Sequence, residues 1–454
     1  MKKWSQSMRK YLKKMYHNKK VLHYNLHDLL ILFGVFLLLQ DLIAKNLEEW
    51  LLLFQSVRYI DEGITLLGFL FLIVIPWFIK GQRPSKTGIE WLLSLFLLIG
   101  IISSIAAQVP LFIAASQFLL YVKGFLFFYI LSSIPANNLT LRKHIRSFAY
   151  VALLFLVLGF VDIVAPYWFR SVTGNVDYID YQMGIPSVKS LFVHPGVFGW
   201  FMAFIALYFF AFFIVFGKGS YLFTSFAFAL GSFFSMRAKP LGGLVGGILA
   251  GLSTLPLTKR IEKGLVIAAI GICISVPVWP KLYGLYESKV TSYVGLRDPM
   301  VNARNALYIT SVDIAKDYFP FGAGFGRYGG WISAKYYSPL YDDYDLSKVY
   351  GMSEEKTSFV CDTFWPMVLG ETGFIGLALY AGILLSFVKT LYRQVKNENN
   401  RYVKAFQLGT LMVLIESLVE SIASPFYSKS PEVYFVLGAV GICYSLSNNR
   451  EASK

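Results

Sequence analysis

Long apolar segments separated by short polar ones repeat along almost the whole chain of 454 residues. Segments of about 20 apolar residues have the length of a helix that crosses the ~30 Å hydrocarbon core of a membrane. The pattern predicts twelve transmembrane helices, at 28–44, 63–80, 87–107, 112–134, 147–167, 190–216, 220–236, 240–257, 264–279, 363–388, 405–424 and 431–448. We therefore expect an all-α polytopic membrane protein.

One long polar stretch interrupts this pattern between residues 280 and 362. Within it we expect helical structure, for example near 300–317. The expected organisation is a basic tail over 1–27, nine transmembrane helices over 28–279, a large loop over 280–362, three transmembrane helices over 363–448 and a short tail over 449–454.

Composition agrees with a membrane protein and excludes a soluble globular one. The chain is 56% hydrophobic and 15% charged, with a mean hydropathy of +0.55, whereas soluble domains are about one quarter charged. The net charge of +15 does not indicate nucleic-acid binding, because the basic residues lie in loops between the predicted helices. The three cysteines have neither the number nor the spacing of a disulfide framework or a metal site.

The basic residues are distributed unevenly between the two faces of the predicted bundle. Eight lie in Met1–Lys20, and no signal-peptide cleavage site follows them. Segments on the side of the N-terminus carry 25 Lys and Arg residues, against seven in the short loops of the opposite side. Because cytoplasmic loops are enriched in Lys and Arg, we expect both termini inside, the basic tail against anionic lipid, and the large loop outside.

This topology brings several polar residues to the outer face. They are His194, Arg237, Lys239, Arg297, Arg304 and Asp362. Arg237 and Lys239 lie in a very short predicted hairpin, and Asp362 closes the large loop. The topology follows from the charges of all the loops and does not depend on these positions in particular, so their location on one face is an independent indication of a site.

The residue types fit chemistry on a lipid-linked sugar. Outside a cell, a sugar chain is carried on a polyprenyl diphosphate, and its transfer leaves negative charge on that diphosphate. A guanidinium binds phosphate oxygens through two parallel hydrogen bonds, so Arg237 and Arg304 could stabilise the leaving group without a metal. The acceptor hydroxyl needs a base, and the carboxylate of Asp362 is one.

Simpler interpretations exist for each of these residues. Arg237 could anchor lipid headgroups, and Arg297 and Arg304 could be surface residues of a soluble loop. Asp362 could cap the helix that follows it. His194 could be a structural residue at a helix start, because a proline follows it.

Two carboxylates inside the membrane also need an explanation. Glu416 and Glu420 share one face of a predicted span, where charged groups are costly and normally paired. Arg237 or Arg304 is the partner we expect. A stripe of glycines in the span 240–257 indicates close helix packing instead of catalysis; these are Gly242, Gly243, Gly246, Gly247 and Gly251.

Two further patterns resemble known motifs. Gly324-Phe-Gly-Arg-Tyr-Gly329 matches the dinucleotide fingerprint, but no βαβ unit surrounds it. We expect a glycine-rich turn there that presents backbone amides to phosphate. Asp343 and Asp345 could hold a divalent metal, but their polar surroundings favour a solvated acidic patch.

Several motifs together resemble the O-antigen ligase and O-antigen polymerase superfamily, over about residues 190–380. They are His194-Pro-Gly196 up to Gly199, Ser235-Met-Arg237, Arg304-Asn-Ala-Leu-Tyr308, Pro320-Phe-Gly322-Ala-Gly324, and Asp362-Thr363 followed by Gly373-Phe-Ile-Gly376. Their order, and the large loop between them, match the family. Asp362 stands where the ligases have histidine, which favours a polymerase.

The resemblance implies a glycosyltransferase of the GT-C membrane class that acts on undecaprenyl-diphosphate-linked glycans without metal or other cofactor. Arg237 and Arg304 would hold the diphosphate, and Asp362 would be the acceptor base. We assign substrate binding to a second group of residues, which comprises His194, Lys239, Arg297, Tyr308, Glu416 and Glu420.

The function we expect is polymerisation of a capsular, exo- or O-antigen polysaccharide at the outer face of the bacterial cytoplasmic membrane. The glycan would move from its lipid diphosphate to a sugar hydroxyl of a lipid-linked repeat unit, with inversion at the anomeric carbon. A flippase and a chain-length regulator would be protein partners. The alternatives are a ligase with a different acceptor, and a flippase or transporter of lipid-linked oligosaccharide.

Overall fold

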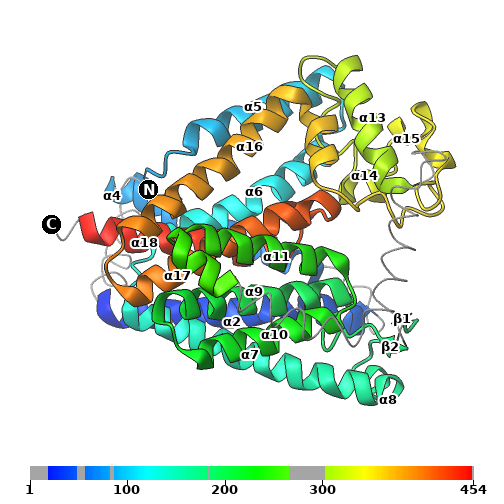
Figure 1. Ribbon diagram of the computed structural model, residues 1–454. Coiled ribbons are helices and arrows are strands. Elements are labelled where there is room, and N and C mark those ends of the chain that lie inside the picture. Colours follow the sequence, from blue (N-terminus) through cyan, green and yellow to red (C-terminus); the bar gives the residue numbers. More distant parts are fainter. Residues whose placement is uncertain are drawn as a thin grey trace.

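The computed structural model describes residues 19–48, 57–81, 86–176, 178–182, 184–264 and 302–451. Within these ranges the chain forms a bundle of helices that lie roughly side by side (Figure 1). The only sheet in the described residues is a hairpin of β1 (Tyr181–Gln182) and β2 (Ile185–Pro186), antiparallel, with Tyr181 opposite Pro186.

One group of helices forms the bundle. They are α2 (Lys19–Glu48), α3 (Ile60–Phe69), the π-helix η2 (Leu70–Val74), α4 (Ile75–Lys80), α5 (Glu90–Ala106), α6 (Leu111–Ser133), α7 (Asn138–Val164), α9 (Pro195–Phe216), α10 (Gly219–Phe234), α11 (Ala238–Ser253), α16 (Trp365–Asn397), α17 (Arg401–Glu420) and α18 (Glu432–Glu451). The other helices connect these or lie at the ends: α8 (Pro166–Val172), α13 (Ala303–Asp317), α14 (Trp331–Lys335), α15 (Leu340–Asp343), η4 (Leu346–Lys348), η5 (Ser421–Ala423) and η6 (Phe426–Ser428).

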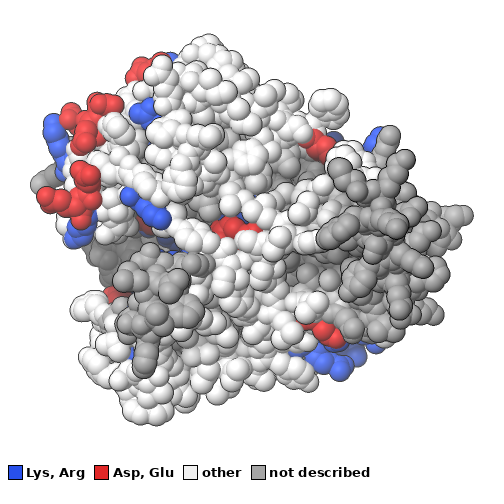
Figure 2. Space-filling model, turned by 180° about the vertical axis from the view of Figure 1, so that it is seen from behind, with Lys and Arg blue, Asp and Glu red and all other residues white. Residues whose placement is uncertain are grey.

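The structure supports a helical membrane protein. In the described residues, seven helical segments are long and apolar enough to cross a membrane, and α5, α10 and α11 are apolar but shorter. Each predicted span lies on a described helix except 264–279, of which all but Gly264 lies outside the described residues. Charged side chains on the face shown in Figure 2 gather toward its two ends, and the broad middle is mostly uncharged.

Some predicted boundaries were wrong, and helix caps explain two of them. Helix α7 begins at Asn138 instead of 147, because the Asn137 side chain accepts hydrogen bonds from the backbone N–H groups of Leu139 and Thr140. Helix α9 begins at Pro195 instead of 190, because Pro195 is suited to the first turn of a helix.

Helix α9 forms the centre of the bundle. It is apolar on all sides, and it is the most deeply buried of the candidate spans. The glycines of α11 allow that helix to approach both α9 and α17. A Cβ atom on Gly247 would lie 2.8 Å from the Leu207 side chain and 2.9 Å from the Met412 carbonyl oxygen. The close packing predicted from the glycine stripe is therefore confirmed.

Residues 302–364 form a small unit with its own core at one end of the bundle. Its buried side chains include Leu307, Ile314, Tyr328 and Tyr341. The expected helix near 300–317 is present as α13. Helix α2 begins and helix α18 ends at the opposite end of the bundle (Figure 1).

The glycine-rich turn between residues 320 and 329 packs into this end of the bundle. The backbone N–H groups of Gly326 and Tyr328 donate to Oε1 of the buried Glu371 over 2.8 and 3.4 Å. The N–H of Gly324 donates to the Glu371 carbonyl oxygen. These amides point inward, so the expectation that the turn presents them to phosphate was wrong. No strand flanks the turn, which also excludes a dinucleotide site in the described fold.

The turn lies against a kink in α16 at Gly373. This residue has φ +65° and ψ −172°, a conformation that is essentially restricted to glycine. A Cβ atom there would lie 2.8 Å from the carbonyl oxygen of Pro320 and 3.1 Å from the N–H nitrogen of Gly322. The kink and the turn therefore depend on each other.

We expect Gly373→Ala to destabilise the protein by about 1–3 kcal/mol, because alanine is strained in this conformation and its methyl group meets backbone atoms. Thermal unfolding in detergent would measure the effect. Gly382→Ala is the matched control on α16, since its Cβ atom would meet only Leu92, at 3.7 Å. Equal unfolding temperatures for the two variants would contradict the structural role of Gly373.

Candidate functional site

The candidate residues lie at the ends of four segments that are far apart in the sequence. His194 precedes α9, Arg237 and Lys239 lie at the start of α11, Arg304 is in the first turn of α13, and Asp362 precedes α16. All four segment ends lie at the end of the bundle that carries α13, α14 and α15 (Figure 1).

Asp362 forms the centre of the cluster. Its Oδ2 atom accepts a 2.6 Å hydrogen bond from Nη2 of Arg304, and its Oδ1 atom lies 3.5 Å from Nζ of Lys239. All three side chains are partly exposed. Helix α16 has Phe364 at its N-cap and no side-chain cap, so the alternative that Asp362 caps this helix was wrong. The carboxylate instead joins the large loop to the α10–α11 turn.

Local structure fixes Arg304 and its neighbour on the same helix. Asn302 caps α13, and its side chain accepts from the backbone N–H of Arg304. One turn further, the hydroxyl of Tyr308 donates to the carbonyl oxygen of Ile422 over 2.8 Å. Burial raises the pKa of Tyr308 to about 12, so the hydroxyl stays protonated near neutral pH. The start of α13 is thereby bound to the loop that follows α17.

Arg237 lies in a tight turn between α10 and α11. Met236 has φ +54°, and the Ser235 hydroxyl donates to the Ser232 carbonyl oxygen over 2.6 Å. The Nη2 atom of Arg237 lies 3.2 Å from Oδ2 of Asp180, beside the β1–β2 hairpin. Its buried Nε atom has no hydrogen-bond partner in the described part of the chain. A buried donor of this kind is rare in folded proteins and is suited to an anionic ligand.

His194 caps α9 and faces the same charges. Its Nδ1 atom accepts from the backbone N–H of Gly196 over 2.9 Å, so in the neutral ring the proton is on Nε2. Burial, followed by the positive charges of Lys429, Arg237 and Lys239, lowers the pKa of His194 below its usual 6.5. The ring is therefore neutral at pH 7 and has one N–H that can donate to a ligand.

The depressed pKa gives a pH test. Below pH 6.5 an unfolded His194 gains a proton that the folded form does not, so acid weakens the fold at this position. In the folded protein with labelled histidine, NMR should show His194 neutral at pH 6. Lys429→Met should raise its pKa because one repelling cation is removed, whereas the distant Lys316→Met should not. Wild-type titration near 6.5 would contradict this assignment.

Lysines, and not the arginines we expected, interact with one of the two carboxylates on α17. Glu416 is fully buried, and neither of its carboxylate oxygens has a hydrogen-bond partner in the described residues. Glu420 interacts electrostatically with Lys239 and Lys429. The expectation of Arg237 or Arg304 as the partner was therefore wrong for Glu420, because the cations that interact with it are Lys239 and Lys429.

Lys429 was missed by sequence reasoning. It lies between α17 and α18, and its Nζ atom is 3.0 Å from Oε1 of Glu432. Its positive charge interacts electrostatically with both His194 and Glu420. A lysine in a short loop that is predicted to lie outside runs against the usual charge bias of such loops, and this signal could have identified it.

The remaining predictions have simple outcomes. Arg297 lies outside the described residues, so its substrate-binding role stays a prediction. Asp343 and Asp345 are exposed, and Asp345 pairs with Lys348 over 2.7 Å, as expected for a solvated acidic patch. In the described ranges, no group of three or more histidine, cysteine, aspartate or glutamate side chains is arranged to hold a metal.

The cluster combines cations that can bind an anion with a carboxylate and a neutral imidazole that can exchange protons. Such an arrangement could hold a phosphate-bearing substrate and activate a hydroxyl beside it. No family model and no curated protein matches the chain.

Proposed function

We propose that this chain is a membrane glycosyltransferase that polymerises a surface polysaccharide from undecaprenyl-diphosphate-linked repeat units. The observation that carries the proposal is the contact of Asp362 with Arg304 and Lys239. This contact supports the proposal because a carboxylate beside two cations, at the end of an apolar bundle, suits the headgroup of a lipid-linked sugar.

The carboxylate of Asp362 occupies the position beside Arg304 and Lys239 that an anionic substrate group would take. An arriving diphosphate would compete with it for Arg304 and Lys239, because a guanidinium binds phosphate and carboxylate with the same geometry. The buried Nε of Arg237 would supply a further donor. Binding of the donor substrate would thus release Asp362 from its ion pairs and leave it free to accept a proton.

The reaction would then be a direct displacement. The acceptor hydroxyl oxygen bonds to the anomeric carbon and loses its proton to Asp362. The bond between that carbon and the diphosphate oxygen breaks, and the electron pair leaves with the diphosphate. Arg304 and Arg237 would stabilise the developing charge, and the anomeric centre would be inverted.

A test needs the full-length protein in detergent or vesicles and lipid-linked repeat units extracted from cells that lack this chain. We expect a ladder of longer glycans, formed equally well in excess chelator. A ligase would consume no substrate until its separate acceptor is added, because repeat units alone do not serve it. No ladder from repeat units alone, together with no consumption of substrate after the separate acceptor is added, would contradict both glycosyltransferase proposals.

One observation favours a second candidate, a transporter of lipid-linked oligosaccharide. Lys123 on α6 lies inside the bundle, with its Nζ atom 2.7 Å from Oε1 of Glu62 and 3.5 Å from Oδ2 of Asp61. Ionisable groups at such positions often belong to substrate or proton pathways. Movement of labelled lipid-linked sugar across vesicles, without any change of its length, would distinguish this function.

A further inference from the structure

A second charged cavity lies at the opposite end of the bundle from Asp362. Its volume is about 660 Å³, within the range of small-molecule sites. It lies between the start of α7, the end of α9 and the start of α17 (Figure 1). Four cations line it, namely Arg142, Arg146, Lys218 and Arg401.

Within the part of the chain that the structure describes, none of these four cations forms an ion pair with a carboxylate. The guanidinium of Arg142 lies 5.0 Å from the centre of the Tyr402 ring. That of Arg401 lies 4.8 Å from the centre of the Phe216 ring and donates to the Val215 carbonyl oxygen over 2.7 Å. These contacts hold the two guanidinium groups in place while leaving other N–H groups for a ligand.

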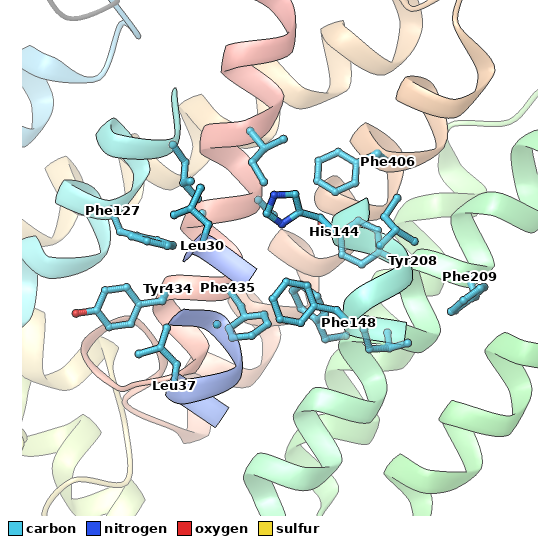
Figure 3. Close-up of a pocket in the computed structure, with 18 residues that line it drawn as sticks. Leu30, Leu37, Phe127, His144, Phe148, Tyr208, Phe209, Phe406, Tyr434 and Phe435 are labelled. Atoms are coloured by element: carbon cyan, nitrogen blue, oxygen red, sulfur yellow. The ribbon is translucent and has the colours of Figure 1, made fainter. Parts of the chain in front are cut away.

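An apolar cavity adjoins the basic one, and the two share Ile145 and Phe209. Aromatic and aliphatic side chains from α2, α6, α7, α9, α17 and α18 form its walls (Figure 3). Its surface is almost entirely apolar. A site with a cationic end and an apolar end matches a molecule that has an anionic head and a hydrocarbon tail.

We propose that these two cavities form one binding site for an anionic phospholipid. The phosphate would lie among Arg142, Arg146, Lys218 and Arg401, and part of an acyl chain would enter the apolar cavity past Ile145. Basic cavities between transmembrane helices suit anionic headgroups because guanidinium groups bind phosphate oxygens in pairs. A free phosphate would use only the basic cavity, whereas a lipid would use both. The site is independent of the function proposed for Asp362.

Binding to the purified full-length protein in a neutral detergent would test the proposal. Three probes separate the possibilities: phosphatidylglycerol, phosphatidylcholine with the same chains, and water-soluble glycerol 3-phosphate. We expect phosphatidylglycerol to bind at least about tenfold more tightly than either of the others. Equal binding of the two lipids would overturn the charge assignment. Glycerol 3-phosphate binding as tightly as phosphatidylglycerol would reveal an anion site without a lipid function.

Variants would then locate the site. Arg142→Gln and Arg401→Gln should each weaken phosphatidylglycerol binding about fivefold, because a cation near a headgroup contributes that much. Lys259→Gln is the matched control, since Lys259 is an exposed cation outside the cavity. An equal loss in this control would mean that the attraction is diffuse, and would overturn the site.

The apolar half needs its own variant. Ile145→Trp adds bulk where the two cavities meet, so it should weaken phosphatidylglycerol binding and leave glycerol 3-phosphate binding unchanged. Thermal unfolding without lipid would establish that each variant is folded. Unchanged phosphatidylglycerol binding in folded Ile145→Trp would exclude the acyl-chain part of the proposal.

Discussion

Asp362→Asn should reduce the rate of chain growth by about 10²- to 10⁴-fold, the usual contribution of a general base. The amide keeps the shape of the side chain but cannot take up the acceptor proton. Partly exposed ion pairs contribute only about 0–1 kcal/mol, so the variant should remain folded in the membrane. Product lengths from the purified protein, resolved on a gel, would measure the effect.

The control for this variant is Asp342→Asn. Asp342 is an exposed carboxylate of the same small unit and is not in the cluster. Chain growth should be normal in this variant. Product of wild-type length from Asp362→Asn would remove Asp362 from the reaction, and the catalytic proposal would lose its base.

Arg304→Gln should have the second largest effect, a loss of about 10²- to 10³-fold in turnover. The side chain would no longer offer a charged fork to the leaving diphosphate. Arg304→Lys should recover part of the rate, because a lysine restores the charge but not the pair of parallel hydrogen bonds. Initial rates at saturating lipid-linked substrate would compare the three proteins.

Lys316→Gln serves as the control on the same helix. Lys316 lies at the far end of α13, exposed, and pairs with Asp313 over 3.2 Å. Its removal should leave the rate unchanged. If Arg304→Gln and Lys316→Gln behave alike, Arg304 is a surface residue, as one interpretation of the sequence allowed.

Hydrophobic periodicity was sufficient to predict the helical membrane architecture. A run of about 20 apolar residues has the length and composition of a helix that crosses hydrocarbon. The predicted spans in the described ranges accordingly all lie on helices. Their ends were less accurate. The first residue of α7 depends on the Asn137 cap, which is a local hydrogen-bonding event and not a property of average hydropathy.

The contacts within the candidate site were only partly predictable. Charge counting indicated that Asp362 and the basic residues share a face, but it does not give the rotation of helices about their axes. It therefore could not show which cations lie beside Glu420, and these are Lys239 and Lys429. The sequence motif likewise predicted the glycine-rich turn. It did not predict that the carboxylate of the buried Glu371 accepts hydrogen bonds from the backbone N–H groups of this turn.

The kink at Gly373 has a mechanical consequence for α16. The segment from Asp362 to the kink is attached to the unit of residues 302–364 through Glu371, while the rest of the helix belongs to the bundle. Gly373 is the one residue within α16 that departs from helical geometry. A tilt of the small unit relative to the bundle would therefore be taken up at Gly373 and would move the Asp362 carboxylate.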